Sequence, residues 1–273
     1  MKLLQLQTKV FADKTETLNY IEKFIKNTIT PEVDFIALPE MFSCPYENKF
    51  FPLYAETYRD TTYKFCQNIA EKYHVYLSAG SIPVINAHGN IFNMAYVFDD
   101  NGNEITHYAK MHLFDIDIAN GQYFKESDTL TAGDEIAVFD TKWGKMGICI
   151  CYDFRFPELS RLMVDKGAKV IFVPAAFNMT TGPLHWNLMF QSRAVDNQVF
   201  TIGTAPAYNK EASYHSWGHS IVVSPWGKIL NELDLTENHQ ITDINLNEVN
   251  AVREQLPLLK HRRLDIYNLK EIK

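Results

Sequence analysis

A chain of 273 residues can bury a sizeable hydrophobic core, and its length alone requires no second domain. Hydrophobic residues make up 46% of the chain and charged residues 22%, which excludes a disordered or fibrous protein. The formal net charge is -7 and the Lys and Arg residues are scattered, so the chain lacks the basic surface of a nucleic-acid-binding protein.

No stretch of the chain reaches the roughly 18 uncharged residues that a membrane span needs, and the first residues do not resemble a signal peptide. We therefore expect a cytoplasmic protein without a membrane partner. The cysteines, Cys44, Cys66, Cys149 and Cys151, are too few and too irregularly spaced for a disulfide framework or a zinc cage. We expect no metal and no cofactor, and a reactive thiol among the four.

Short apolar runs that predict strands alternate with helical patterns along the first half of the chain. Strands are expected at residues 2–8, 33–38 and 75–82, and helices at residues 14–27 and 61–73. The first helix has a clear start, because Asp13 can cap it and Glu16 follows three residues later. Leu18, Ile21 and Ile25 fall on one face of this helix, which should pack against a sheet.

An antiparallel hairpin is expected from residues 93–99 and 104–110, because Asp100-Asn101-Gly102 between them favours a tight turn. The second half of the chain predicts strands at 145–150, 169–174, 198–205 and 218–224, and helices at 157–166 and 184–197. This alternation indicates an α/β fold with mixed sheets. No linker or repeat divides the chain, so we expect one domain over residues 1–273, with residues 256–273 as a C-terminal arm.

Three predicted strands end in a residue that can carry chemistry. Glu40 follows the apolar run that ends in Leu38-Pro39, Lys110 follows Tyr108-Ala109, and Cys151 follows Cys149-Ile150. Strand ends are where α/β folds present reactive groups, because the sheet fixes the strand and the loop is free to direct a side chain. A carboxylate, an ammonium and a thiol in this shared position are what acyl transfer from an amide needs.

Each of the three residues also has a structural interpretation. Glu40 alone could be a solvated loop carboxylate, Lys110 a surface lysine and Cys151 a small buried hydrophobic residue. In the catalytic hypothesis, Glu40 accepts the proton of the Cys151 thiol as a general base. Lys110 and the backbone N–H of Tyr152 then stabilise the negative charge of the tetrahedral intermediate.

The segments around these residues resemble the nitrilase superfamily of carbon–nitrogen hydrolases. The similar segments are Leu38-Pro39-Glu40-Met41-Phe42, Tyr108-Ala109-Lys110-Met111-His112-Leu113-Phe114-Asp115 and Gly147-Ile148-Cys149-Ile150-Cys151-Tyr152-Asp153-Phe154-Arg155-Phe156-Pro157-Glu158. The likeness continues through residues 177–186 and 193–197, so it covers nearly the whole chain. It implies a four-layer αββα sandwich in which Glu40, Lys110 and Cys151 are catalytic.

Within the superfamily the sequence looks most similar to the omega-amidases, which hydrolyse the terminal amide of 2-oxoglutaramate and 2-oxosuccinamate. This likeness rests on residues 110–117, on Phe124-Lys125-Glu126-Ser127 and on the loop at 177–186. It implies a second carboxylate in the site, Glu126, which would orient the amide nitrogen or Lys110. The alternative is that Glu126 is a loop carboxylate.

Such a substrate carries a distal carboxylate, and a guanidinium binds that group in bidentate geometry. We assign this role to Arg155, whose alternative is an ion pair with Glu158. Tyr152, Phe177, Thr180 and Thr181 are the other expected substrate-binding residues. His185, Trp186, Cys149 and the pair Arg193 and Asp196 are expected to be structural.

Other functions remain open at this stage. The same catalytic residues would serve an amidase for N-carbamoyl amines, aliphatic amides or deaminated glutathione, and less readily a nitrile hydrolase. A non-catalytic binding subunit is a further alternative, and a zinc hydrolase lacks the HExxH spacing among the nine histidines. The expected partners are a small amide, water and a second copy of the chain. The superfamily likeness implies a homodimer formed by the helices at 157–166 and 184–197, with the arm at its interface.

Overall fold

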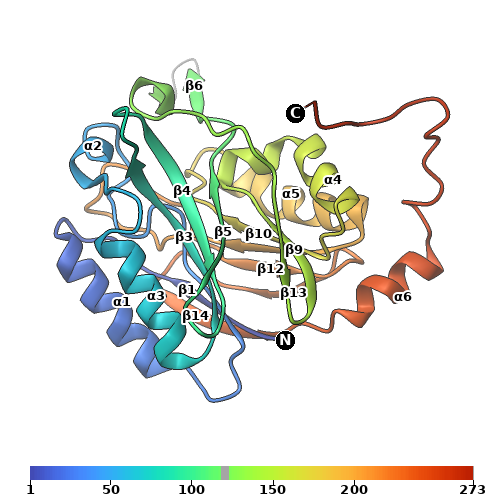
Figure 1. Ribbon diagram of the computed structural model, residues 1–273, viewed down its shortest axis with the longest axis horizontal. Coiled ribbons are helices and arrows are strands. Elements are labelled where there is room, and N and C mark those ends of the chain that lie inside the picture. Colours follow the sequence, from blue (N-terminus) through green and yellow to red (C-terminus); the bar gives the residue numbers. More distant parts are fainter. Residues whose placement is uncertain (118–122, 273) are drawn as a thin grey trace.

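The computed structural model describes residues 1–117 and 123–272, which form two six-stranded sheets (Figure 1). The first sheet has the order β14-β1-β2-β3-β4-β5 and the second the order β13-β12-β11-β10-β9-β8. The strands of the first sheet are β1 (Lys2–Gln7), β2 (Phe35–Ala37), β3 (Tyr76–Ile85), β4 (Ile91–Phe98), β5 (Glu104–Ala109) and β14 (Asn238–Asp243). Those of the second are β8 (Ala137–Thr141), β9 (Gly144–Ile148), β10 (Val170–Pro174), β11 (Phe200–Thr204), β12 (Ile221–Val223) and β13 (Ile229–Glu232).

Helices cover the outer face of each sheet. In Figure 1, α1 (Lys14–Thr28) and α3 (Thr61–Tyr73) lie on one side of the strands, and α4 (Pro157–Asp165) and α5 (Gly182–Asn197) lie on the other. The apolar side chains of α1 and α3 form one core with the first sheet. The apolar side chains of α4 and α5 belong to a second core, which packs against the second sheet and fills the space between the two sheets. The expected αββα sandwich with mixed sheets is therefore confirmed.

The N-terminus of α1 forms as its sequence predicts. The Asp13 carboxylate accepts a hydrogen bond from the backbone N–H of Glu16 at 2.7 Å, so it caps one of the free amides of the first turn. Leu18, Ile21 and Ile25 are buried against the sheet. Helix α3 begins and ends at the predicted residues.

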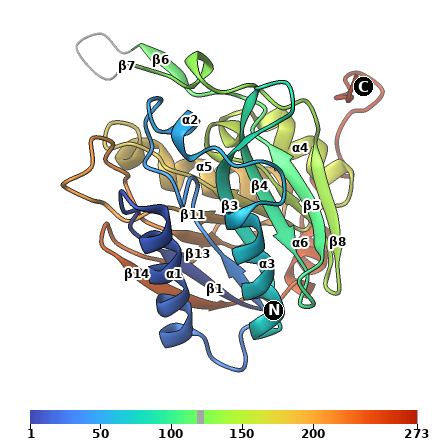
Figure 2. The same cartoon turned by 60° about the vertical axis from the view of Figure 1, so that its left-hand side comes forward.

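Several elements lie outside the sequence predictions. They are the short helix α2 (Phe51–Tyr54), the pair β6 (Asp115–Asp117) and β7 (Tyr123–Lys125), strands β8, β13 and β14, and helix α6 (Asn247–Gln255). Strands β6 and β7 form a separate ribbon that projects from the body (Figure 2). Among the described residues, none of the helices combines the length and apolar character needed to cross a membrane.

Several predicted strands are shorter than expected, among them β2, β9, β11 and β12. Gln198 has a left-handed backbone, with φ of 52°, because it ends helix α5, so β11 begins only at Phe200. Strand β9 ends at Ile148, because the chain turns into the 3₁₀ helix η2 (Cys151–Arg155) soon afterwards.

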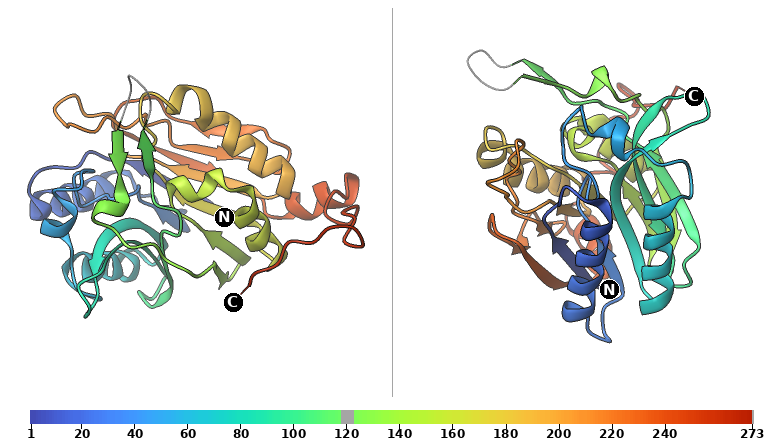
Figure 3. Two further views of the ribbon diagram at one scale, coloured as in Figure 1. Left: turned by 90° about the horizontal axis from the view of Figure 1, so that it is seen from above. Right: turned by 90° about the vertical axis from the view of Figure 1, so that its left-hand side faces the viewer.

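Residues 256–272 contain no regular helix or strand and run along the edge of the molecule beyond α6 (Figure 3). Arg262 fixes the start of this segment by two hydrogen bonds to the Asp165 carboxylate, at 2.9 and 2.7 Å. Further along, Leu264, Ile266 and Tyr267 expose more than half of their side chains. Lys273 lies outside the described residues.

The sheets meet so that several strands end at one edge of the sandwich. Strands β1, β2 and β3 are parallel, and β5 runs in the same direction because β4 is antiparallel to both β3 and β5. In the second sheet β9, β10 and β11 are parallel. The rings of Phe35 in β2 and Phe172 in β10 stack at 4.6 Å and place these two strands face to face.

Gly80 lets β3 approach the end of β2 closely. A Cβ atom at this position would lie 2.0 Å from the carbonyl oxygen of Pro39, and the backbone φ of +30° is unfavourable for other residues. A register shift between Ala79 and Ile82 accompanies this close contact. The chain therefore turns immediately before Glu40 with little freedom.

Candidate active site

The structure brings Glu40, Lys110, Glu126 and Cys151 together. Glu40 follows β2, Lys110 follows β5, Glu126 begins the 3₁₀ helix η1 (Glu126–Asp128), and Cys151 begins η2. Their exposed fractions are 1%, 0%, 0% and 5% respectively. The interpretations of Glu40 as a solvated loop carboxylate and of Lys110 as a surface lysine are therefore wrong, and Glu126, whose alternative was a loop carboxylate, is fully buried in η1.

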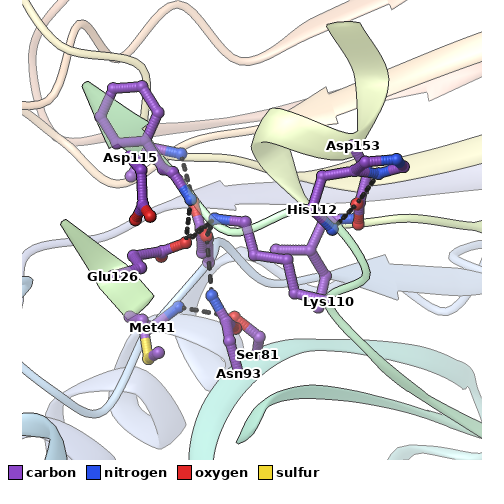
Figure 4. Close-up of polar contacts among 12 residues, drawn as sticks. Met41, Ser81, Asn93, Lys110, His112, Asp115, Glu126 and Asp153 are labelled. Atoms are coloured by element: carbon purple, nitrogen blue, oxygen red, sulfur yellow. Dashed lines mark hydrogen bonds and ion pairs between the residues drawn. The ribbon is translucent and has the colours of Figure 1, made fainter. Parts of the chain in front are cut away.

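The Lys110 ammonium is within hydrogen-bond distance of both carboxylates, and Figure 4 shows it beside Glu126. Its Nζ is 3.0 Å from Glu40 Oε1, and 3.0 and 2.9 Å from the two oxygens of Glu126. Burial alone would lower the pKa of Lys110, but the charges of Glu126 and Glu40 outweigh it and raise the pKa. Lys110 is therefore a permanent cation in the site.

Both oxygens of Glu40 accept hydrogen bonds from other parts of the fold. Asn93 donates its side-chain amide to Oε1 at 2.9 Å, and the backbone N–H of Ala176 donates to Oε2 at 2.9 Å. Burial raises the pKa of Glu40, Lys110 opposes this shift, and the charge of Glu126 adds to it. Glu40 thus has a higher proton affinity than an exposed glutamate.

Glu126 is held as firmly as Glu40. Phe114 donates its backbone N–H to Oε2 at 2.7 Å, and the Tyr46 hydroxyl donates to Oε1 at 2.6 Å. With Lys110 in contact with both oxygens, the carboxylate has no free direction in which to rotate. Glu126 therefore fixes the position of the Lys110 ammonium.

Cys151 is presented from a strained backbone. Its φ is 47°, and Met41, the residue after Glu40, has a φ of 51°. A left-handed conformation costs a residue with a side chain about 1–3 kcal/mol and tends to occur at functional sites. The Cys151 thiol lies close enough to the Glu40 carboxylate, the Lys110 ammonium and the backbone N–H of Ala176 for all three to affect its pKa.

The pKa of the Cys151 thiol is raised, first by burial and then by the charge of Glu40, while Lys110 acts in the opposite direction. The resting cysteine is therefore a neutral thiol next to a carboxylate that can accept its proton. This arrangement can activate a nucleophile only when the proton moves to Glu40.

Arg155 does not pair with Glu158 as its structural alternative required. Its Nη1 lies 3.0 Å from His185 Nδ1, and its guanidinium packs over the Phe177 ring at 4.7 Å. His185, expected to be only structural, therefore contacts a candidate substrate-binding residue. Arg193 and Asp196 do form the expected ion pair, at 3.8 Å.

The other predicted substrate-binding residues lie around the loop after β10. Phe177 is buried against Trp186, and Tyr152 is half-buried in η2. Thr180 and Thr181 donate their backbone N–H groups to the Asn178 side chain at 3.0 and 2.8 Å, which shapes the start of α5.

A cavity of about 490 Å³ includes Glu40 in its lining. Ala176 and Tyr214 line it near Glu40, and Lys49 is the only lysine or arginine among its lining residues. Its lining includes none of the five predicted substrate-binding residues, Tyr152, Arg155, Phe177, Thr180 and Thr181.

Three contributors to the site were missed from the sequence. Tyr46 lies in a loop, Asn93 lies within β4, and Ala176 contributes only its backbone. Asn93 was the one with a usable signal, because a fully buried amide in an apolar strand requires a partner. Cys149 is fully buried in the core, as expected.

The family is shown by comparison with known proteins. Residues 3–254 match the family model described as "Carbon-nitrogen hydrolase". The chain belongs to the carbon–nitrogen hydrolase family. Two curated relatives of this hydrolase are named as omega-amidases, NIT2 of Homo sapiens and NIT3 of Saccharomyces cerevisiae.

The human protein is 39% identical over 266 residues, which cover 97% of this hydrolase and 96% of the relative. The yeast protein is 41% identical over 263 residues, covering 94% and 90%. The crystal structure of yeast Nit3, described as a member of branch 10 of the nitrilase superfamily, has a TM-score of 0.87 and 37% identity. That match covers 96% of each chain, so this hydrolase is an amidase of the nitrilase superfamily.

Proposed function

We propose that this hydrolase removes the terminal amide of omega-amide keto acids, 2-oxoglutaramate and 2-oxosuccinamate, to give the dicarboxylate and ammonia. The observation that carries the proposal is the buried contact of Lys110 with two carboxylates beside the Cys151 thiol. The names of the full-length relatives support the substrate class.

The first half of the reaction forms a thioester. Glu40 takes the thiol proton of Cys151, and the sulfur attacks the amide carbon to form a C–S bond. Lys110 and the backbone N–H of Tyr152 stabilise the resulting oxyanion. Glu40 then returns the proton to the amide nitrogen, the C–N bond breaks and ammonia leaves.

Water completes the reaction. Glu40 accepts a proton from the water as its oxygen attacks the thioester carbon, and the C–S bond breaks to release the carboxylic acid. The proton then returns to the cysteine sulfur. The raised pKa of Glu40 supports this double role, because its proton affinity approaches that of the groups it must exchange protons with.

Glu126 acts through Lys110 in this proposal. Its two oxygens lie within hydrogen-bond distance of Nζ, so it holds the ammonium at the place where the oxyanion develops. These contacts favour a role for Glu126 in orienting Lys110 rather than in orienting the amide nitrogen of the substrate.

A substrate panel tests the proposed function. Ammonia release is measured with 2-oxoglutaramate and succinamate, and with N-carbamoyl amino acids and simple aliphatic amides for comparison. We expect the first two to be hydrolysed with the highest kcat/KM. Absence of ammonia from both, with turnover of another amide, would replace the omega-amidase assignment by that other specificity.

Arg155 is the proposed partner of the distal carboxylate, and Phe177, Thr180 and Thr181 are the other residues proposed to contact the substrate with it. The half-buried guanidinium is oriented by His185 and Phe177, which reduces the entropy it loses on binding. Arg155→Gln is expected to raise KM for 2-oxoglutaramate about 10- to 100-fold, which corresponds to the loss of one charge-assisted hydrogen bond. The kcat for a neutral amide is expected to stay unchanged.

Lys49→Gln is the matched control for that substitution. Lys49 is the cation that lines the cavity, where it pairs with Glu47 at 2.8 Å. If KM rises in this variant and not in Arg155→Gln, the distal carboxylate lies in the cavity and the assignment to Arg155 is wrong.

A homodimer is proposed from the outer face of α5. Leu184, Leu188 and Val195 are 71%, 62% and 40% exposed and share one side of this helix. Helix α4 and the arm at 256–273 would complete the interface. Light scattering is expected to give a dimer for the wild type and a monomer for Leu188→Glu, whereas Leu53→Glu on α2 leaves the dimer intact. A monomeric wild type would contradict the proposal.

A further inference from the structure

Asp153 is a fully buried carboxylate that stands outside the proposed chemistry. Its Oδ2 accepts hydrogen bonds from the Ile150 backbone N–H at 3.0 Å and from the Tyr108 hydroxyl at 2.9 Å. Its Oδ1 accepts from the His112 backbone N–H at 2.7 Å and lies 2.8 Å from His112 Nδ1. Figure 4 shows Asp153 and His112 facing each other beside Lys110.

All of these partners flank a residue of the catalytic set. Tyr108 and His112 lie two positions before and after Lys110, and Ile150 immediately precedes Cys151. Tyr108 lies in β5 of one sheet and His112 follows that strand, whereas Ile150 follows β9 of the other sheet. Asp153 therefore links the ends of two strands that belong to different sheets.

The same carboxylate closes the turn that contains Cys151. The Asp153 backbone N–H donates to the Ile150 carbonyl at 3.0 Å, while the Ile150 N–H donates to the Asp153 side chain. Cys151 lies inside this reciprocal pair with its left-handed φ of 47°. The pair stabilises a backbone conformation that a residue with a side chain otherwise avoids.

We propose that Asp153 is a positioning residue that fixes the Cys151 thiol and the Lys110 ammonium relative to each other. A buried carboxylate with four hydrogen-bond contacts has few ways to shift, so it transmits the position of one strand end to the other. His112 supports it, because the imidazole stacks on the Phe156 ring at 3.8 Å and an angle of 12°. The inference rests on the proposed roles of Lys110 and Cys151, and not on which amide is the substrate.

Asp153→Asn tests this role through the separation of kcat from KM. The asparagine amide keeps one oxygen that accepts hydrogen bonds, but its NH₂ group faces groups that are themselves donors. The segments that contain Lys110 and Cys151 therefore lose their common anchor. We expect kcat to fall about 10²-fold, as for a small misplacement of reacting groups, and KM to change less than about threefold.

Glu104→Gln is the matched control. Glu104 is also a carboxylate that accepts from tyrosine hydroxyls and a histidine, with Tyr58 at 2.8 Å, Tyr63 at 2.9 Å and His107 at 2.8 Å. It lies at the start of β5, at the end of that strand away from Lys110. The same chemical change there is expected to lower the melting temperature and leave kcat unchanged.

Alkylation of Cys151 by iodoacetamide gives a readout that does not need a substrate. We expect its rate, followed by mass spectrometry of the Cys151 peptide, to fall about tenfold or more in Asp153→Asn and to stay unchanged in Glu104→Gln. Loss of alkylation in the wild type as well would contradict the role of Cys151 itself, which separates failure of the proposed chemistry from failure of this inference.

A folded Asp153→Asn protein with kcat and alkylation rate within about twofold of the wild type would overturn the inference. If that variant does not fold, Tyr108→Phe is measured instead, because it removes one donor and adds no new group. Its kcat is expected to fall about fivefold, the value of one hydrogen bond, at unchanged KM. A kcat equal to that of the wild type would then refute the positioning role.

Discussion

Cys151→Ala is expected to abolish amide hydrolysis and to leave the fold intact. Without a nucleophile no thioester forms, and Glu40 and Lys110 alone provide only weak catalysis, so turnover falls by at least about 10⁴-fold. The fold is expected to tolerate the change because it removes a single buried sulfur atom, and the hydrogen bond from the Ala176 N–H to Glu40 does not involve that atom. Ammonia release and thermal unfolding measure the two effects.

Cys149→Ala provides the control for this variant. Cys149 is fully buried in the core two residues before Cys151, so its loss leaves a small cavity and costs about 1 kcal/mol of stability. Turnover is expected to persist. The opposite pattern, with an active Cys151→Ala and an inactive Cys149→Ala, would show that the assignment of the nucleophile to Cys151 is wrong.

Helices α1 and α3 could be predicted closely because their signals are local, whereas the short helices α2 and α6 were missed. Asp13 and Glu16 define the start of α1, and residues 61–73 carry the complete pattern of α3. Strand β14 could not be predicted in this way. Its sequence, Asn-His-Gln-Ile-Thr-Asp, has only two buried side chains, and it forms by pairing with β1 from the opposite end of the chain.

In the site, too, residues with a local sequence signal could be predicted, and residues placed by tertiary contacts could not. Glu40, Lys110 and Cys151 could be found because each follows a recognisable strand, and Glu126 because its segment resembles a known family. Tyr46 carries no comparable signal, since a tyrosine in a loop points to no particular partner. Its hydroxyl donates to Glu126, a residue 80 positions further along the chain, and that contact depends on the tertiary fold.

The Asp153 contacts depend on that assembly too. A carboxylate two residues after a nucleophile has many possible partners, and the sequence does not indicate which. The structure shows that Tyr108 and His112, on either side of Lys110, and Ile150, next to Cys151, all donate to it, which is the basis for the positioning role proposed above.

Lys110→Met is expected to remove activity and to destabilise the protein more than any other substitution in the site. The ammonium is fully buried and lies within 3.0 Å of both Glu40 and Glu126. Its loss leaves two buried carboxylates without a cation, which costs about 3–5 kcal/mol of unfolding free energy. Turnover falls at least about 10²- to 10³-fold with the loss of oxyanion stabilisation. Urea unfolding and ammonia release measure both.

The destabilisation is expected to depend on pH with a definite sign. Burial already raises the pKa of Glu40 and Lys110 opposes that shift, so the pKa rises further in Lys110→Met. The folded state then binds a proton more tightly than the unfolded chain, where a glutamate has a pKa of about 4.3. The free energy of unfolding therefore falls as the pH rises above about 4.3, and the variant is less stable at about pH 7 than at about pH 5.

The double variant Lys110→Met/Glu126→Gln separates the structural from the catalytic role of the lysine. Replacing Glu126 removes one of the two uncompensated carboxylates, so part of the lost stability is expected to return. Turnover is expected to stay absent, because no cation faces the developing oxyanion. Recovery of stability together with turnover would instead show that Lys110 only neutralises buried carboxylates, and Glu40 and Cys151 would then have to carry out the reaction without it.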